Sequence, residues 1–333
     1  MTGRTQLSKG PLTHTLRGIV TVLNTPFTED DRLDLDSLQR NVVRALEAGV
    51  AGFLVPALAG EVGQLSFDER IALVRTVIDR SKDCPSPASS AGLGANRKAG
   101  SRPYIIGGAT ASEPKERLRA AEALVRMGCD GVLVWIPYTT DKEYAEQVRE
   151  IASLKPPFLM LQDWDPSGPG LPIPLIQRLF EEVEEFQALK VETIPAGPKY
   201  TAVLQATGGK LHVSGGWAVT QMIEGLDRQV HAFMPTGMHE VYCEIYRRYA
   251  SGDRKGATDL FHRILPILAF SNQHLDLSIL FFKRLLWKEG TYATPRCRKL
   301  SLAFDSIQER IADELIELAI QTREQVQGGR FEL

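Results

Sequence analysis

The sequence contains few cysteines and almost no net charge, and these shortages exclude several classes of protein. Its four cysteines, Cys84, Cys129, Cys243 and Cys297, lie far apart and form no CxxC pair. This spacing argues against a disulfide framework or a zinc knuckle, and it indicates a reducing compartment. The formal net charge is −2, so the chain lacks the basic balance typical of proteins that bind nucleic acid or anionic membranes.

Long hydrophobic runs are also missing. No stretch approaches the ~18 consecutive apolar residues that a membrane-spanning helix needs, and residues 1–17 carry basic side chains without the apolar core of a signal peptide. We therefore expect a soluble, cytoplasmic protein. The 333 residues are 43% hydrophobic, which is enough for a sizeable core. This length is compatible with two domains or with one α/β barrel.

Short apolar runs alternate with amphipathic segments from residue 18 to residue 251. Most of these runs are continuously apolar, as expected for parallel strands that are covered on both faces. Eight strand–helix units in succession predict a (β/α)8 TIM barrel rather than an open doubly wound sheet. The expected strands are Ile19–Asn24, Gly52–Pro56, Tyr104–Gly107, Gly131–Ile136, Phe158–Gln162, Ala188–Glu192, Leu211–Ser214 and Val230–Met234.

Two segments depart from this alternation. Residues 252–327 contain only helical patterns, and we expect a C-terminal extension of three helices at Arg254–Phe270, Asn272–Glu289 and Lys299–Gln327. Residues 83–103 are rich in Pro, Ser, Gly and Ala and show no periodicity, which predicts a flexible insertion on the N-terminal face of the barrel.

Lys190 is the only base in the apolar run from Phe186 to Glu192. A charged amine is costly in such a place, and desolvation favours the neutral form, which can attack a carbonyl and form a Schiff base. The alternative is a lysine at a strand end with its ammonium group in water. Because catalytic groups of TIM barrels project from the C-terminal ends of strands, the position of Lys190 favours the nucleophile.

Several markers along the chain support this interpretation. They are Asn24-Thr25-Pro26-Phe27, Gly60-Glu61, Leu65-Ser66, Glu69-Arg70, Pro137-Tyr138, Lys190, Ser214-Gly215-Gly216 and Lys283. In this order and spacing they resemble the dihydrodipicolinate synthase / N-acetylneuraminate lyase family over residues 18–300. The resemblance implies a class I aldolase-type lyase that joins a 2-oxo acid to Lys190 as an imine. It also implies no cofactor and no metal, and an assembly into homotetramers or dimers.

The departures from the family pattern concern the groups around the lysine. The family's Gly-Thr-Thr, which holds the substrate carboxylate, is Ala57-Leu58-Ala59 here, so two hydroxyl donors are missing. The usual strand-five tyrosine, the proton shuttle, is absent from Leu161 to Pro166. The arginine that often grips a second carboxylate is absent between Asp163 and Gln177. These departures disfavour true dihydrodipicolinate synthase activity.

Glu192 and Gln162 are the polar candidates nearest to the lysine in the pattern. Glu192 lies two residues after Lys190, so strand alternation should place both side chains on the same side. It is a candidate acid/base or the ion-pair partner of the amine, and the alternative is a solvated carboxylate at a strand end. Gln162 could touch substrate or order water at the barrel mouth. Asp163 and Asp165 could bind a metal, but a loop turn is the better interpretation.

The remaining candidates are substrate-binding positions that the resemblance implies: Leu58, Ala59, Gly60, Tyr138, Gly215 and Met234. Tyr138 and Met234 could equally be packing residues. We therefore expect a lyase that forms a Schiff base through Lys190, with Glu192 as a second catalytic group, for aldol cleavage, condensation or dehydration of a 2-oxo acid. The alternative is a non-catalytic carbonyl-binding or scaffold protein that kept the fold and lost the proton relay.

Overall fold

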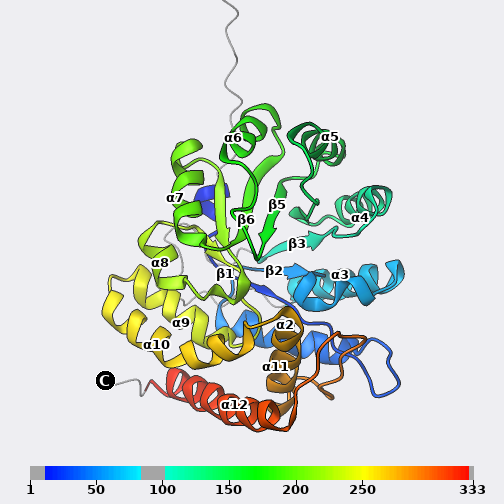
Figure 1. Ribbon diagram of the computed structural model, residues 1–333. Coiled ribbons are helices and arrows are strands. Elements are labelled where there is room, and N and C mark those ends of the chain that lie inside the picture. Colours follow the sequence, from blue (N-terminus) through cyan, green and yellow to red (C-terminus); the bar gives the residue numbers. More distant parts are fainter. Residues whose placement is uncertain (1–11, 84–101, 330–333) are drawn as a thin grey trace, which may run out of the picture.

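A computed structural model describes residues 12–83 and 102–329 and contains a closed barrel of eight parallel strands (Figure 1). The predicted (β/α)8 TIM barrel is therefore confirmed. Each strand pairs with its neighbours in sequence order, and β1 closes the barrel against β8. The strands are β1 (Gly18–Val22), β2 (Gly52–Val55), β3 (Tyr104–Gly108), β4 (Gly131–Val134), β5 (Leu159–Asp165), β6 (Phe186–Thr193), β7 (His212–Gly215) and β8 (Ala232–Phe233).

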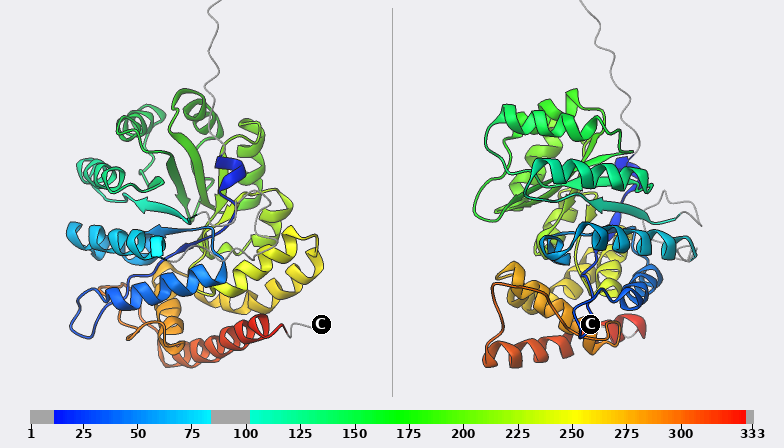
Figure 2. Two further views of the ribbon diagram at one scale, coloured as in Figure 1. Left: turned by 180° about the vertical axis from the view of Figure 1, so that it is seen from behind. Right: turned by 90° about the vertical axis from the view of Figure 1, so that its right-hand side faces the viewer.

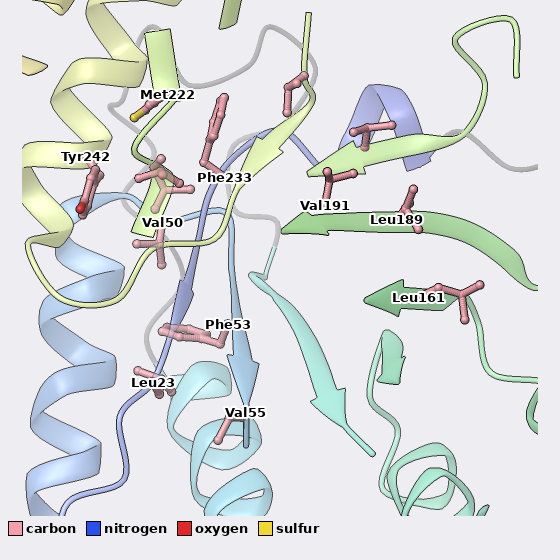
Figure 3. Close-up of a cluster of buried hydrophobic side chains, with 14 of the residues drawn as sticks. Leu23, Val50, Phe53, Val55, Leu161, Leu189, Val191, Met222, Phe233 and Tyr242 are labelled. Atoms are coloured by element: carbon pink, nitrogen blue, oxygen red, sulfur yellow. The ribbon is translucent and has the colours of Figure 1, made fainter. Parts of the chain in front are cut away.

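The strands separate two hydrophobic cores because successive side chains point to opposite faces. One core fills the barrel and includes Leu54, Met160 and Ala188. The other core lies between the strands and the surrounding helices; Phe53 and Leu189 belong to it, as Figure 3 shows. On β6, Ala188 therefore points inward and Leu189 outward, and this alternation places Lys190 and Glu192 on the inner side.

Each strand is followed by a helix that covers the outside of the barrel. Capping residues mark several helix starts. For example, Ser66 and Glu69 exchange side-chain-to-backbone hydrogen bonds at the start of the helix Phe67–Asp83. The barrel helices are α2 (Leu35–Ala48), α3 (Phe67–Asp83), α4 (Pro114–Arg126), α5 (Asp141–Ala152), α6 (Ile173–Glu182), α7 (Ala196–Ala206), α8 (Met222–Asp227) and α9 (His239–Ala250).

Three helices follow the barrel: α10 (Arg254–Ser271), α11 (Leu275–Lys288) and α12 (Ser306–Gln327). Two of them begin later than the sequence pattern predicts. Asp305 caps α12 through a capping box with Gln308, and the His274 side chain caps α11, so each cap sets the first residue of its helix. Helix α11 packs against the short 3₁₀ turn η1 (Leu58–Gly60) that follows β2, which brings it to the mouth of the barrel.

A short helix, α1 (Leu12–Thr15), lies at the opposite end of the barrel (Figure 2). Leu12 and Leu16 join the core inside the barrel, and the Leu16 carbonyl lies 2.8 Å from His212 Nε2. Residues 84–101 of the predicted insertion lie outside the described residues. Within 12–83 and 102–329, no helix combines the length and the apolar character that crossing a membrane requires.

Candidate active site at the mouth of the barrel

Lys190 and Glu192 form an ion pair on the inner side of β6. Lys190 Nζ lies 2.9 Å from Glu192 Oε1, and the two side chains are 6% and 5% exposed. Strands β5 and β6 extend further than most of their neighbours, which carries these residues to the rim of the barrel. The pair places a carboxylate directly beside the amine that the sequence identifies as the nucleophile.

Two donors hold the Glu192 carboxylate in place. Gln162 Nε2 donates to Glu192 Oε2 at 2.5 Å, and the backbone N–H of Trp217 donates to Oε1 at 2.8 Å. The register of β5 and β6 pairs Gln162 with Lys190, so the amide lies within reach of both residues. Gly216 leaves room for the carboxylate, because a Cβ there would lie 2.3 Å from Glu192 Oε1. The orientation of Glu192 is thus set by three different strands and loops.

The pair opens into a narrow cavity of about 40 Å³. Of the residues predicted from the sequence, it brings together Lys190, Glu192, Gln162, Met234, Leu58 and Ala59. Gly60, Tyr138 and Gly215 are not among the residues that line it. Other positions line it that the sequence did not suggest: Val22, Ala57, Trp164, Trp217, Thr236, Asn272, Leu275 and Ser278.

The three predicted residues outside the cavity have structural contacts instead. Tyr138 is 46% exposed, and its hydroxyl donates to Asp141 at 2.7 Å, a hydrogen bond that raises the pKa of the tyrosine. The Gly60 carbonyl accepts a hydrogen bond from Thr25 Oγ1 at 2.6 Å. Gly215 packs closely against Tyr200 and the Phe233 ring.

Two tryptophans cover part of the cavity. The rings of Trp164, on β5, and Trp217, in the loop after β7, meet edge to face with their centroids 4.9 Å apart. Trp217 has a φ of +52°, a left-handed conformation that is uncommon for residues other than glycine. This conformation presents the Trp217 N–H to Glu192 and the Trp217 ring to Trp164.

Asp163 and Asp165 have partners that explain both residues without a metal. Asp163 Oδ2 lies 3.0 Å from Lys199 Nζ, and Oδ1 accepts from the Leu171 N–H at 2.8 Å. Burial raises the pKa of Asp163, and Lys199 opposes this shift. Asp165 accepts from the N–H groups of Ser167 and Gly170 and so orders the turn after β5. Across the part of the chain that the structure describes, no group of three His, Cys, Asp or Glu residues is arranged to hold a metal ion.

A second lysine, Lys283 of α11, is buried against the segment after β2. Lys283 Nζ donates to Glu61 Oε1 and, at 2.6 Å, to the Arg296 carbonyl. Glu61 Oε2 accepts from the Arg298 N–H at 2.8 Å. The lysine side chain is 0% exposed and that of Glu61 is 1% exposed. This network ties α11 to the barrel and helps to position the helix over the cavity.

Comparison with known proteins is consistent with this geometry. The model of the dihydrodipicolinate synthetase family matches residues 15–86. The 4-hydroxy-tetrahydrodipicolinate synthase of Methanosarcina mazei is 28% identical over 91% of this chain and 98% of that protein. These matches show that the chain is similar to dihydrodipicolinate synthases at low sequence identity.

Other similar proteins carry different names. The L-2-keto-3-deoxyarabonate dehydratase of Azospirillum brasilense is 25% identical over 85% of this chain and 87% of that protein. The match to the Natronomonas pharaonis 4-hydroxy-tetrahydrodipicolinate synthase, at 30% identity, spans only 37% of that protein. The crystal structure of dihydrodipicolinate synthase from Rhodopseudomonas palustris has the same fold, with a TM-score of 0.78 at 21% identity over 91% of this chain and 97% of that one.

Sequence patterns could not have identified every residue that lines the cavity. Trp164 follows the inward positions Met160 and Gln162 at spacings of two, so strand periodicity could have suggested it. Trp217, Asn272 and Ser278 lie in a loop, at a helix end and on α11, where no period relates them to Lys190. They reach the cavity only because α11 and the loop after β7 fold over the mouth of the barrel.

Proposed function

We propose that this protein is a Schiff-base lyase that dehydrates a 2-oxo acid bound to Lys190. The observation that carries the proposal is the Glu192 carboxylate, 2.9 Å from Lys190 Nζ inside a cavity at the mouth of the barrel. A buried amine that lies beside a carboxylate and lines a cavity has the nucleophile, the acid/base and the space for a carbonyl that imine chemistry needs.

Glu192 first assists imine formation. The ion pair transfers a proton from Nζ to the carboxylate, and the neutral amine then attacks the carbonyl carbon C2 of the substrate. The carbonyl oxygen leaves as water after it gains two protons, one of which Glu192 supplies. The product is a protonated imine at C2, which withdraws electrons from the neighbouring C–H bond at C3.

Elimination then uses the same carboxylate. Glu192 removes a proton from C3 and passes it to solvent, the electron pair forms an enamine, and the hydroxyl group at C4 takes a proton from solvent and leaves as water. A base beside Nζ lies next to C3, because only C2 separates C3 from the imine nitrogen. Aldol cleavage instead needs a base at the C4 hydroxyl, one bond further from Lys190. This difference in reach supports dehydration over cleavage.

Gln162 has a supporting role in this scheme. An amide does not titrate near neutral pH, so Gln162 orients the carboxylate rather than moving a proton. The dehydratase named among the relatives matches this chain over 85% of its length, which supports the same reaction class. We propose that 4-hydroxy-tetrahydrodipicolinate synthesis is not the activity, since both the strand-five tyrosine and an arginine between Asp163 and Gln177 are missing.

The test is reductive trapping of the imine. Borohydride should fix pyruvate or a longer 2-oxo acid onto the wild-type protein, and mass spectrometry should map the adduct to Lys190. Lys190→Ala should abolish trapping and leave the fold intact, whereas Lys210→Ala, which removes an exposed lysine, should trap normally. An adduct on Lys199 or Lys283 would contradict the mechanism. Trapping without turnover of any 2-oxo acid would indicate a carbonyl-binding protein that lacks catalysis.

A further inference from the structure

A second cavity adjoins the Lys190 cavity at the carboxyl ends of β6 and β7. Its volume is about 240 Å³, and it is bordered by the segment after β6, the loop after β7 and the end of α10. Glu192, Trp217 and Asn272 line both cavities, so these residues form the wall between them. A larger space therefore lies directly behind the proposed catalytic carboxylate.

Two polar groups in this second cavity have no partner. Thr193 Oγ1 and Asn272 Nδ2 are buried and make no hydrogen bond with any residue that the structure describes. Buried polar atoms nearly always have a hydrogen-bond partner, and an atom without one in the protein calls for a bound water or ligand. The two groups offer a hydroxyl, which donates and accepts, and an amide N–H, which donates.

The charge of the lining limits what binds there. Glu192 is its only charged side chain among the residues described, and no lysine or arginine faces the cavity. A second carboxylate or a phosphate would lie near Glu192 without a cation to balance it. Uncharged hydroxyl groups suit the lining, because they exchange hydrogen bonds with Thr193 and Asn272.

The size of the Lys190 cavity also indicates that a longer substrate needs the second cavity. At about 40 Å³ it has room for about three water molecules, which is too little for a substrate much longer than its reacting end. We propose that the second cavity binds the hydroxylated, uncharged end of the 2-oxo acid whose carbonyl reacts with Lys190. This subsite rests on the proposed Schiff-base function. Trp217 lines both spaces and therefore lies between them.

The experiment compares two probes on the same protein. Borohydride trapping is titrated with pyruvate, which has no hydroxylated end, and with L-2-keto-3-deoxyarabonate, which has one. The ratio of the two half-saturating concentrations is the readout. In Asn272→Leu and in Thr193→Val, the half-saturating concentration of the longer acid should rise about 5-fold relative to that of pyruvate. This change corresponds to the loss of one neutral hydrogen bond. Thr193→Ser, which keeps the hydroxyl, should retain the wild-type ratio.

Thr258→Val is the matched control. Thr258 also carries a buried hydroxyl without a partner in the described chain, but it lines neither cavity, so its loss should leave the ratio unchanged. An unchanged ratio in both Asn272→Leu and Thr193→Val overturns the subsite while the Schiff base stands. Failure of the wild-type protein to trap either acid overturns the Schiff-base function itself.

Discussion

Lys190 and Lys283 are both buried beside a glutamate, but Lys190 also lines the cavity at the mouth of the barrel, and Lys283 does not line it. Lys283 Nζ donates to Glu61 and to the Arg296 carbonyl, and it lies 4.4 Å from the centre of the Phe27 ring. Among the residues described, Glu192 is the ion-pair partner of Lys190, and the lysine lines a cavity. An amine surrounded by acceptors stabilises the fold, whereas one with a single partner and adjacent space can receive a carbonyl.

Lys199 is, like Lys283, an amine surrounded by acceptors. Its amine lies 3.0 Å from Asp163 and donates to the carbonyls of Pro169, at 2.8 Å, and Leu171. Burial beside a carboxylate therefore does not identify a nucleophile in this protein. The mouth cavity, which Lys190 lines and Lys199 and Lys283 do not, makes the distinction, and it can be tested by substituting each member of the Lys190–Glu192 and Lys283–Glu61 pairs.

The largest difference should be in stability. Lys283→Met leaves Glu61 buried without its cation, and removing one partner of a buried ion pair costs about 3–5 kcal/mol. Lys190→Met should cost only about 1 kcal/mol, because Glu192 keeps the donors Gln162 and Trp217 and borders a cavity that admits water. Urea unfolding measures both. Equal losses in the free energy of unfolding of Lys283→Met and Lys190→Met would mean that the two lysine–glutamate pairs contribute equally to stability, contrary to this expectation.

The opposite end of the barrel holds two buried histidines, and no acid of residues 12–83 and 102–329 acts on the pKa of either one. The rings of His212 and His231 stack 5.1 Å apart. Desolvation lowers the pKa of His212 to about 3 and that of His231 to about 4, from an ordinary 6.5. Since the unfolded chain binds protons first, stability should be full above pH 6.5 and fall as the pH drops toward 4, by up to about 1.4 kcal/mol per pH unit for each histidine.

Urea midpoints at pH 7 and pH 5 measure this loss. His212→Gln keeps a donor for the Leu16 carbonyl but does not titrate, so it should flatten the pH dependence. His262→Gln changes an exposed histidine and should leave the pH dependence of stability as it is in the wild type. An equal change in urea midpoint between pH 7 and pH 5 in the wild type and in His212→Gln would show that other groups govern the acid sensitivity. The buried histidines would then not differ from the lysine–glutamate pairs in the way proposed.

Glu192 should control catalysis, whereas Glu61 should control stability. Glu192→Gln keeps the shape and hydrogen bonding of the side chain but removes the titrating group, so kcat should fall by about 10²-fold while imine trapping persists. Glu61→Gln should lower the free energy of unfolding and change kcat much less. Steady-state kinetics and borohydride trapping on both variants test this. Normal turnover by Glu192→Gln would assign proton transfer to water or to the substrate.

A smaller effect should follow from moving Glu192 without removing it. A Cβ at position 216 would lie 2.3 Å from Glu192 Oε1, so Gly216→Ala must displace the carboxylate. We expect a fall in kcat of roughly 10-fold, because misplacement by about an ångström is costly but leaves the base present. Gly63→Ala is a suitable control, since a Cβ there meets nothing within 4 Å. Unchanged kcat in Gly216→Ala would show that the position of Glu192 is not critical.

Much of the barrel could be predicted from the sequence because apolar runs and helix caps are local signals. The eight strands lie where the pattern indicates, but β5 continues three residues past Gln162 and β8 is reduced to Ala232–Phe233. Gly60, Tyr138 and Gly215 were expected at the site through family resemblance, and they do not line the cavity. Their positions depend on how each loop turns after its strand, which strand periodicity does not describe.

The sequence by itself determined the barrel and the placement of Lys190 and Glu192 on one side of a strand, because both depend on regular spacing of side chains along the chain. Tertiary structure decided which of the buried lysines lines the mouth cavity, since Lys190, Lys199 and Lys283 all lie near carboxylates. It also brought Trp217 and Asn272 to the site. A cavity forms where side chains from distant segments fail to fill space, and only their packing in three dimensions determines that.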